Sequence, residues 1–186
     1  FNENKEKIRH ATIERIEHKM GHHASVTVTI NFDRTPAEPV GKLGDGFKQM
    51  LLLMNNARIG VGFEGLGICE AAWRMSTRYA SERKSMGKTI DQHELIAEML
   101  AEMKATTIGL RALCMKVAYL NEIFSRRKLR LQFLTEKGTT EYTTLAKQVQ
   151  DLKQQTRLLT PLVKMVGSEA AVRLSRMAIQ IHGGCG

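Results

Sequence analysis

The sequence has few aromatic residues and no long apolar run. Aromatic residues make up only 5% of the 186 residues, whereas methionine alone occurs 10 times. Because unbranched side chains lose little rotamer freedom in a helix, this balance favours packed helices over a β-sandwich. No apolar run approaches the roughly 18 residues of a membrane span, so no transmembrane helix is predicted. The apolar content of 42% still suffices for the core of one domain, or of one and a half.

Cysteine is also scarce, which excludes two classes of small fold. Cys69, Cys114 and Cys185 lie far apart and form no CxxC pair, so neither a zinc ribbon nor a disulfide framework is indicated. A reducing compartment follows, either the bacterial-type cytoplasm or the mitochondrial matrix, with the cytoplasm preferred. The chain lacks a secretory signal and begins with Phe1 rather than methionine, so we expect its natural N-terminus to lie upstream.

Acidic residues are outnumbered, 19 against 28 lysines and arginines, for a formal charge of +9. Such an excess suggests a polyanionic partner: nucleic acid, an anionic membrane surface or a phosphorylated cofactor. The net charge alone does not distinguish among these three kinds of partner. The basic run Arg126–Arg130 lacks the interleaved aromatic residues that stack on bases.

No metal site is predicted. His18, His22 and His23 lack an accompanying cysteine or carboxylate cluster with ligand spacing. Glu94, Glu98 and Glu102 repeat at helical spacing without the Glu-x-x-His motifs of a di-iron bundle, so they indicate a solvated helix face.

The first forty residues and the rest of the chain differ in pattern. Apolar and polar residues alternate over 24–32, which predicts a half-buried strand, and 11–17 is a weaker candidate. Two strands bury no core by themselves, so this segment is expected to be the edge of a larger sheet. Prolines and glycines between Pro36 and Gly46 predict a loop.

The remainder predicts helices over 47–83, 92–124, 145–158 and 161–182, with 125–144 as an exposed loop or a short helix. Thr160 fits an N-cap and Pro161 a first helical position. The fold class is therefore mainly α: an antiparallel four-helix bundle preceded by the edge of a β-domain, α+β overall. Four glycines, at positions 60, 62, 65 and 67, fall inside the first helix. Each costs roughly 1 kcal/mol against alanine, which indicates a close approach of another backbone or of a flat ligand.

Two segments combine glycine with polar anchors at helix ends. Arg83 can hold a phosphate as a bidentate fork and Ser85 adds a hydroxyl donor. In the second segment Gly183 and Gly184 admit a flat or phosphorylated group, because no Cβ stands in the way, and Gln180 can donate or accept. A solvated basic loop and a plain helix C-cap are the alternatives for each segment taken alone.

These two segments, read as YASERKSMGK and QIHGGCG, resemble motifs of the acyl-CoA dehydrogenase family in the same order and spacing. EHKMG from Glu17, GDGF from Gly44, MNNAR from Met54 and LTPLVK from Leu159 are similar to further family segments. The last looks closest to the larger bacterial members that act on acyl groups such as methylthiopropionyl-CoA. The resemblance covers nearly the whole chain and is weakest over 125–150, where an insertion is indicated.

The resemblance implies a domain division and a cofactor. Residues 1–44 would be the end of the family's middle β-domain with its linker, and 45–186 the C-terminal helical bundle, truncated at its end. The cofactor would be FAD, held by two groups of residues, in part across a subunit interface. These cofactor-binding residues are Arg83, Ser85, Met86, Gln180, Ile181, His182, Gly183 and Gly184.

The resemblance also implies a reaction, α,β-dehydrogenation of an acyl-CoA thioester. Asn55 and Arg58 would lie in the acyl-CoA cleft, an electron-transfer flavoprotein would accept the electrons, and the protein would be a homodimer or homotetramer. The expected catalytic glutamate is not in this chain: Ala57 occupies one family position for it and the other would follow Gly186. Glu64 is interpreted as a helix-surface or interface residue, and we expect the chain by itself to be inactive. The alternative is a non-catalytic basic helical module that binds nucleic acid or a protein partner.

Overall fold

The computed structural model describes residues 10–186, and its contacts divide the chain into two compact units at Phe47 and Lys48. The first unit contains an antiparallel hairpin of β1 (Ala11–Ile16) and β2 (Val28–Phe32). Its register shifts between Ile13 and Arg15, as at a β-bulge. Both predicted strands are confirmed, with the second one shorter than expected.

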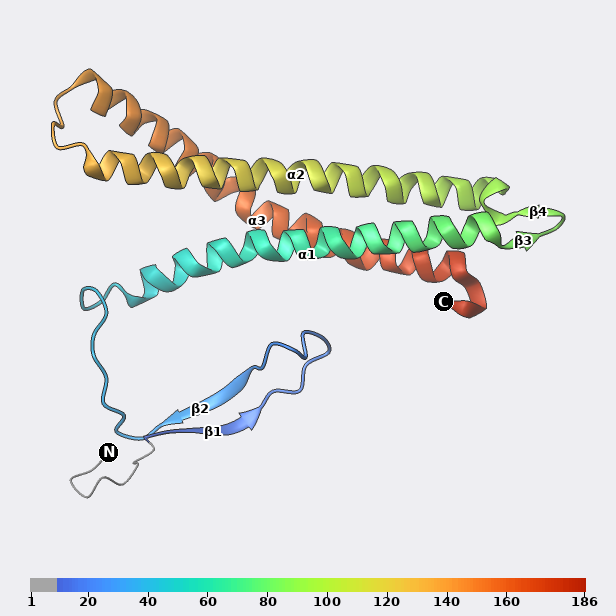
Figure 1. The fold of residues 1–186 in the computed structure, drawn as a ribbon, viewed down its shortest axis with the longest axis horizontal. Coiled ribbons are helices and arrows are strands. Elements are labelled where there is room, and N and C mark those ends of the chain that lie inside the picture. The colour runs from blue at the N-terminus through green and yellow to red at the C-terminus, as the bar shows by residue number, and fades with distance from the viewer. Residues whose placement is uncertain (1–9) are drawn as a thin grey trace. The chain divides into compact units, whose positions relative to one another are not determined.

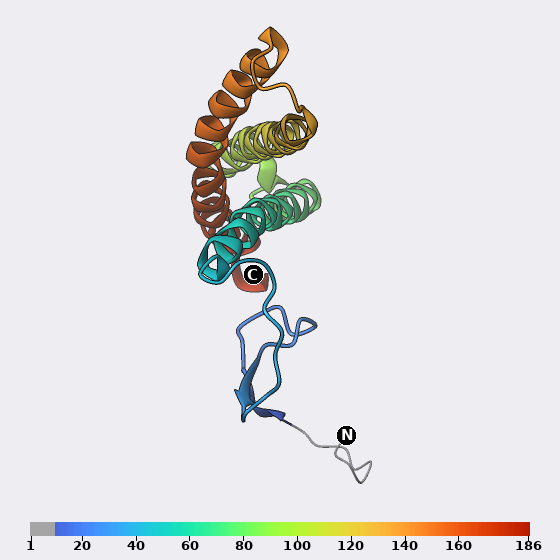
Figure 2. The same ribbon diagram turned by 90° about the vertical axis from the view of Figure 1, so that its left-hand side faces the viewer.

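The second unit is built from three long helices, α1 (Gly46–Glu82), α2 (Glu94–Phe133) and α3 (Thr140–His182). A small hairpin of β3 (Lys84–Ser85) and β4 (Lys88–Thr89) joins α1 to α2. In Figure 1 successive helices run in opposite directions, and Figure 2 shows α3 inclined across the other two. The mainly helical class is confirmed.

The expected number of helices is wrong, because the described residues form three long helices where four were predicted. α3 runs without interruption through Pro161, although proline removes a backbone hydrogen bond inside a helix. Thr160 is therefore not an N-cap; it is 5% exposed in the middle of α3, and Val163 is fully buried. Burial on both sides of the proline stabilises the helix beyond what local propensity indicates.

The prediction of an exposed loop or a short helix over 125–144 is also largely wrong, since α2 continues to Phe133 and α3 begins at Thr140. Side-chain pairs one turn apart support the extension of α2. Arg126 pairs with Glu122, and the Lys128 ammonium lies 6.0 Å from the centre of the Phe124 ring. At the start of α3 the Thr139 hydroxyl accepts a hydrogen bond of 3.2 Å from the Tyr142 amide, as an N-cap does.

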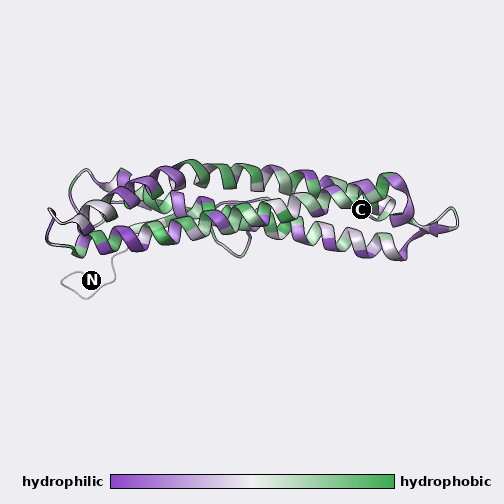
Figure 3. Ribbon diagram, turned by 90° about the horizontal axis from the view of Figure 1, so that it is seen from above, coloured by the Kyte–Doolittle hydropathy of each residue, from purple (hydrophilic) through white to green (hydrophobic). Residues whose placement is uncertain are grey.

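The core lies inside the helical unit and draws on all three helices. The hydropathy colouring of Figure 3 shows hydrophobic and hydrophilic residues alternating along each helix, as in amphipathic helices packed around one core. Two ion pairs join the helices near this core: Arg111 of α2 with Glu70 of α1, and Arg173 of α3 with Glu102 of α2. The fully buried hydrophobic side chains are Cys69, Ala80, Met103, Cys114, Val117, Val163 and Leu174.

α1 and α3 cross so closely that their backbones meet. A Cβ added to Gly65 would lie 2.5 Å from the Gly167 carbonyl oxygen, and one on Gly62 would lie 2.9 Å from Val163 Cγ2. Gly60 and Gly67 have open space at the same position. The prediction of a close neighbour therefore holds for two of the four glycines. In both cases the neighbour is α3, through its backbone or a side chain.

Candidate functional site

The first predicted segment forms a tight turn at the end of α1. Met86 and Gly87 have φ angles of 52° and 83°, so the β3–β4 hairpin closes with two residues of positive φ, as a type I′ turn does. Positive φ is uncommon for methionine. The Arg83 amide donates to the Tyr79 carbonyl and the Arg83 carbonyl accepts from Ile90, each at 2.9 Å. The turn is therefore anchored to the end of α1.

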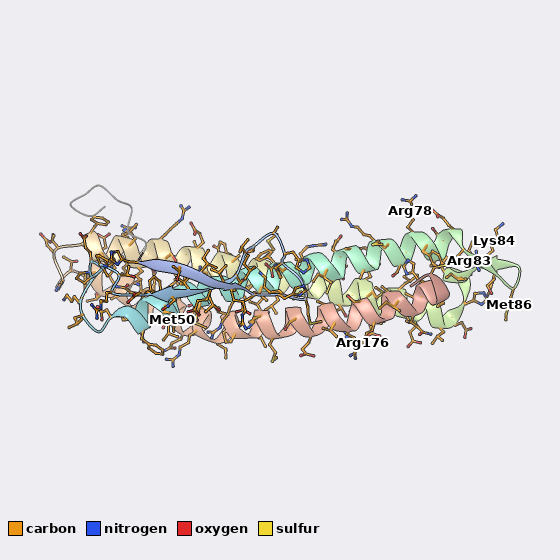
Figure 4. All side chains as sticks on the ribbon, turned by 90° about the horizontal axis from the view of Figure 1, so that it is seen from below. Met50, Arg78, Arg83, Lys84, Met86 and Arg176 are labelled. Carbon is orange, nitrogen blue, oxygen red and sulfur yellow. The ribbon has the colours of Figure 1, made fainter. Side chains whose placement is uncertain are left out.

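This hairpin presents cations to solvent. Arg83, Lys84, Ser85 and Met86 are exposed, with Met86 at 92%. Among residues 10–186 no carboxylate pairs with Arg83 or Lys84. Figure 4 shows both side chains at the hairpin end of the helical unit. Two cations without a partner carboxylate in the described chain form a local positive charge suited to a phosphate.

The second predicted segment forms the end of α3. Gly183 has φ of 59° and ends the helix, and its amide donates to the Gln180 and Ile179 carbonyls. Gln180, Gly183 and Gly184 are exposed, and a Cβ on either glycine would meet nothing within 4 Å. The segment therefore offers an open backbone surface at a helix terminus.

The two segments meet at one end of the helical unit. The Tyr79 and His182 rings stack with centroids 4.5 Å apart and planes 26° from parallel. Tyr79 lies one turn before Arg83, and His182 immediately precedes Gly183. In Figure 1 the end of α3 lies near the base of the β3–β4 hairpin. The structure thus brings together two groups that are nearly a hundred residues apart in sequence.

Not every predicted cofactor residue is equally available to a ligand. Ile181 is 4% exposed and belongs to the hydrophobic core, so its side chain supports the helix end from within. His182 is half-buried, and its Nδ1 lies 2.7 Å from the Ala178 carbonyl oxygen. Arg176 is exposed one turn before Gln180 and is seen on α3 in Figure 4. Its i, i+4 spacing to Gln180 places the two residues on one helix face.

The two predicted substrate residues form a separate group on α1. The Arg58 guanidinium donates to Asn55 Oδ1 at 2.8 Å, and Arg58 is half-buried while Asn55 is exposed. Twenty-five residues of helix separate Arg58 from Arg83, a rise of about 37 Å. The predicted residues therefore divide into two groups along α1. Ala57 and Glu64 are both exposed, as expected for a helix surface.

Two of the three cysteines of the helical unit, Cys69 and Cys114, are core residues rather than reactive thiols. Cys69 and Cys114 are fully buried, and Cys185 is exposed. Burial raises the pKa of both Cys69 and Cys114, which favours the uncharged and less nucleophilic form. Within the described residues no group of three or more histidine, cysteine, aspartate or glutamate side chains is arranged to hold a metal ion. None of the described helices is long and apolar enough to cross a membrane.

Comparison with known proteins identifies relatives along most of the chain. Residues 44–125 match the model of the acyl-CoA dehydrogenase C-terminal domain. The chain is 30% identical over 181 residues to 3-methylmercaptopropionyl-CoA dehydrogenase of Ruegeria pomeroyi, covering 92% of this chain and 28% of that protein. It is 32% identical over 178 residues to acryloyl-CoA reductase (NADH) of Anaerotignum propionicum, covering 94% of this chain and 38% of that protein. The chain thus spans roughly a third of the length of these relatives.

Solved structures show the same fold. Butyryl-CoA dehydrogenase from Megasphaera elsdenii superposes with a TM-score of 0.71 at 29% sequence identity, over 94% of this chain and 39% of that one. The first predicted segment lies within the residues that match the family model. The chain is therefore similar to acyl-CoA dehydrogenases over most of its length, and residues 44–125 match that family's C-terminal domain.

Proposed function

We propose that this chain is part of an FAD-dependent acyl-CoA dehydrogenase and that the hairpin end of its helical unit binds the dinucleotide portion of FAD. The observation that carries the proposal is the stacking of Tyr79 on His182, because it holds the Arg83 turn and the Gly183 helix end side by side. Neither segment alone distinguishes a ligand site from a solvated loop or a helix cap. Their proximity favours a ligand that contacts both.

The exposed residues at this end fit a pyrophosphate joined to a heteroaromatic group. Arg83 and Lys84 supply charge-assisted donors, and Ser85 supplies a hydroxyl. Gly183 and Gly184 leave backbone accessible, since a Cβ at either position would meet nothing within 4 Å. The Gln180 amide is exposed beside them. Met86 would contact the ligand through its apolar side chain, and Ile181 and His182 would hold the helix end in position.

The Asn55–Arg58 pair is proposed to bind the polar part of the acyl-CoA. Met50 and Met54 precede Arg58 at intervals of four residues, so the three share one helix face. They are 46% and 41% exposed, which leaves an apolar strip leading to the guanidinium. An acyl chain along the methionines and a polar head group near Arg58 would match this order of side chains.

The proposed reaction is α,β-dehydrogenation of an acyl-CoA thioester. Bound FAD supplies the hydride acceptor, and a carboxylate removes the α-proton. No residue of this chain is assigned that carboxylate, and the assignment of residues 1–44 to the end of a β-domain stays a prediction. An electron-transfer flavoprotein as the acceptor, a homodimer or homotetramer, and a cytoplasmic location are further parts of the proposal.

The test is the flavin content of the protein expressed from its complete gene. Arg83→Ala is expected to lower FAD occupancy after gel filtration about tenfold, since a charge-assisted hydrogen bond to a phosphate is worth roughly 1.5–3 kcal/mol. Helix content by circular dichroism should not change, because Arg83 is exposed. Arg126→Ala removes another exposed arginine, from the other end of α2, and serves as the control. Equal flavin occupancy in both variants would contradict the assignment.

The alternative of a basic module for nucleic acid has no comparable support. Both sequence relatives described above are named for reactions of acyl-CoA compounds. Two cations of the basic run are paired with acidic neighbours, Arg126 with Glu122 and Arg130 with Glu141. DNA binding whose affinity falls steeply as the salt concentration rises would support this alternative.

A further inference from the structure

The last nine residues of α2 lie outside the segment that matches the dehydrogenase domain. The family match ends at residue 125, whereas α2 continues to Phe133. We call residues 125–133 the α2 tip. In Figure 1 the α2 tip lies at the opposite end of the helical unit from the β3–β4 hairpin, and α2, at 40 residues, is about 60 Å long. Any function of the α2 tip is therefore separate in space from the proposed dinucleotide site.

The α2 tip places two apolar side chains on its outward face. Arg127 and Leu131 are half-buried and follow the buried Leu120 at helical spacing, so they continue the core-facing side of α2. Leu129 and Phe133 lie one turn apart on the other side, and they are 55% and 75% exposed. The α2 tip therefore presents an apolar pair that its own helical unit does not cover.

Cations lie on both flanks of this apolar pair. Lys128 and Arg130 directly precede and follow Leu129, and each residue turns the helix by about 100°, so the two cations lie on opposite sides of the leucine. Lys128 has no carboxylate partner among residues 10–186, and its ammonium lies 6.0 Å from the centre of the Phe124 ring. The apolar face is thus bordered by positive charge along its length.

The charge of the α2 tip has one sign. Its nine residues include four cations and no acidic side chain. Glu122 and Glu141, which lie outside the tip, pair with Arg126 and Arg130, but these carboxylates are 58% and 57% exposed. Ion pairs this exposed contribute little to stability, so the arginines can exchange them for other anions. Four cations around an exposed apolar pair form a surface suited to a partner that is both anionic and apolar.

A bilayer that contains anionic lipids has both of these properties. Its charged head groups lie above acyl chains, so flanking cations and an apolar face between them meet matching layers. Nucleic acid matches the charge, but it offers no apolar layer to Leu129, and the α2 tip has a single aromatic residue, Phe133, for stacking on bases. Charge and apolar exposure together therefore favour the membrane surface.

We propose that the α2 tip docks this protein on the surface of a membrane rich in anionic lipids. Leu129 and Phe133 enter the interface between head groups and acyl chains, and Lys128 and Arg130 contact the head groups. The contact is peripheral, since none of the described helices is long and apolar enough to cross a membrane. This inference goes beyond the dehydrogenase proposal and concerns the other end of the helical unit.

The first experiment measures cosedimentation of the protein, expressed from its complete gene, with two kinds of vesicle. Binding is expected to an equal mixture of phosphatidylcholine and phosphatidylserine and not to phosphatidylcholine alone, and it should weaken as salt is raised from about 0.1 to 0.5 M. Leu129→Ala and Phe133→Ala should each weaken binding about tenfold, because each removes a large apolar side chain from the interface. Leu95→Ala, at a leucine that is 70% exposed near the other end of α2, is the control and should bind like the original protein.

The second experiment tests the charge and separates this proposal from the flavin site. Lys128→Gln should weaken binding to the mixed vesicles about fivefold, whereas Lys104→Gln, at another exposed lysine of α2, should not. Flavin occupancy should stay unchanged in both variants, and Arg83→Ala should lower flavin occupancy without changing vesicle binding.

Three results would overturn the proposal: no binding to the mixed vesicles, equal binding to both kinds of vesicle, or equal losses in Leu129→Ala and Leu95→Ala. Binding to a DNA duplex that Phe133→Ala leaves unchanged, without binding to vesicles, would assign the α2 tip to nucleic acid instead. Because all of the substituted side chains are exposed, helix content by circular dichroism should match the original protein in every variant.

Discussion

The β1–β2 hairpin and the helical unit differ in whether they bury their own apolar residues. All six residues of β1 and four of the five residues of β2 are exposed. Ile13, Ile16 and Phe32 are 64%, 68% and 66% exposed. In the helical unit, by contrast, Met103, Val163 and other large side chains have no exposed area at all.

This difference shows that the same kind of sequence signal can have two outcomes. The alternation of Val28, Ile30 and Phe32 is as regular as the helical periodicity of α2, yet it produces a strand with no core of its own. In a hairpin of two strands, each strand pairs with only one other strand, and nothing within the hairpin covers either face of the sheet. Three long helices enclose a volume between them, so the helical unit stabilises itself.

The largest effect that distinguishes the two regions is expected from truncating a buried side chain. Leu174→Ala should lower the free energy of unfolding by about 2–5 kcal/mol, because it removes contacts and leaves a cavity. Phe32→Ala, at a side chain that is 66% exposed, should change it by no more than about 0.5 kcal/mol. Urea unfolding followed by circular dichroism at the helical band measures both. A comparable loss in Phe32→Ala would mean that an exposed strand side chain contributes as much to stability as a core residue.

A smaller effect is expected at the crossing of α1 and α3. Gly65→Ala should destabilise the helical unit by about 1–3 kcal/mol, since its Cβ would meet the Gly167 carbonyl oxygen at 2.5 Å. Gly67→Ala, on the same helix with nothing within 4 Å, should stabilise it by up to about 1 kcal/mol. The same urea titration compares them. If both variants raise the free energy of unfolding, or both lower it, the glycines are not needed for the close crossing of α1 and α3.

The smallest effect concerns pH and is again specific to the helical core. Burial raises the pKa of Cys69 and Cys114 in the folded state, so the unfolded chain loses these thiol protons first. Their contribution to stability is complete below about pH 8.5, the ordinary range of a free thiol, and is lost as the pH rises above it.

The measurement is the pH dependence of the unfolding free energy between about pH 7.5 and 9.5, which spans the ordinary thiol pKa. The double variant Cys69→Ala, Cys114→Ala should have a lower stability and a flatter decline with pH than the original chain. Cys185→Ser, at an exposed thiol, is the control and should keep the original slope. An unchanged slope in the double variant would show that the buried thiols do not cause the decline.

Local pattern was sufficient for most elements but not for all of their limits. The boundaries of α1 were predicted within one residue, because its apolar periodicity begins and ends sharply around Gly46 and Glu82. The break expected at Thr160 and Pro161 was wrong, since a local rule for proline was outweighed by burial of the residues around it. The loop expected after Phe124 was wrong because its polar sequence is stabilised as helix by pairs one turn apart.

The sequence by itself determined the resemblance to acyl-CoA dehydrogenases, the helical class and the candidate residues for a phosphate, because these depend on residue type and short-range spacing. Only the tertiary structure decided which of these residues meet. The stacking of Tyr79 on His182 and the contact of Gly65 with Gly167 both depend on how α3 crosses its neighbours. A crossing is set by the packing of whole helix faces, and spacing along one segment carries no information about it.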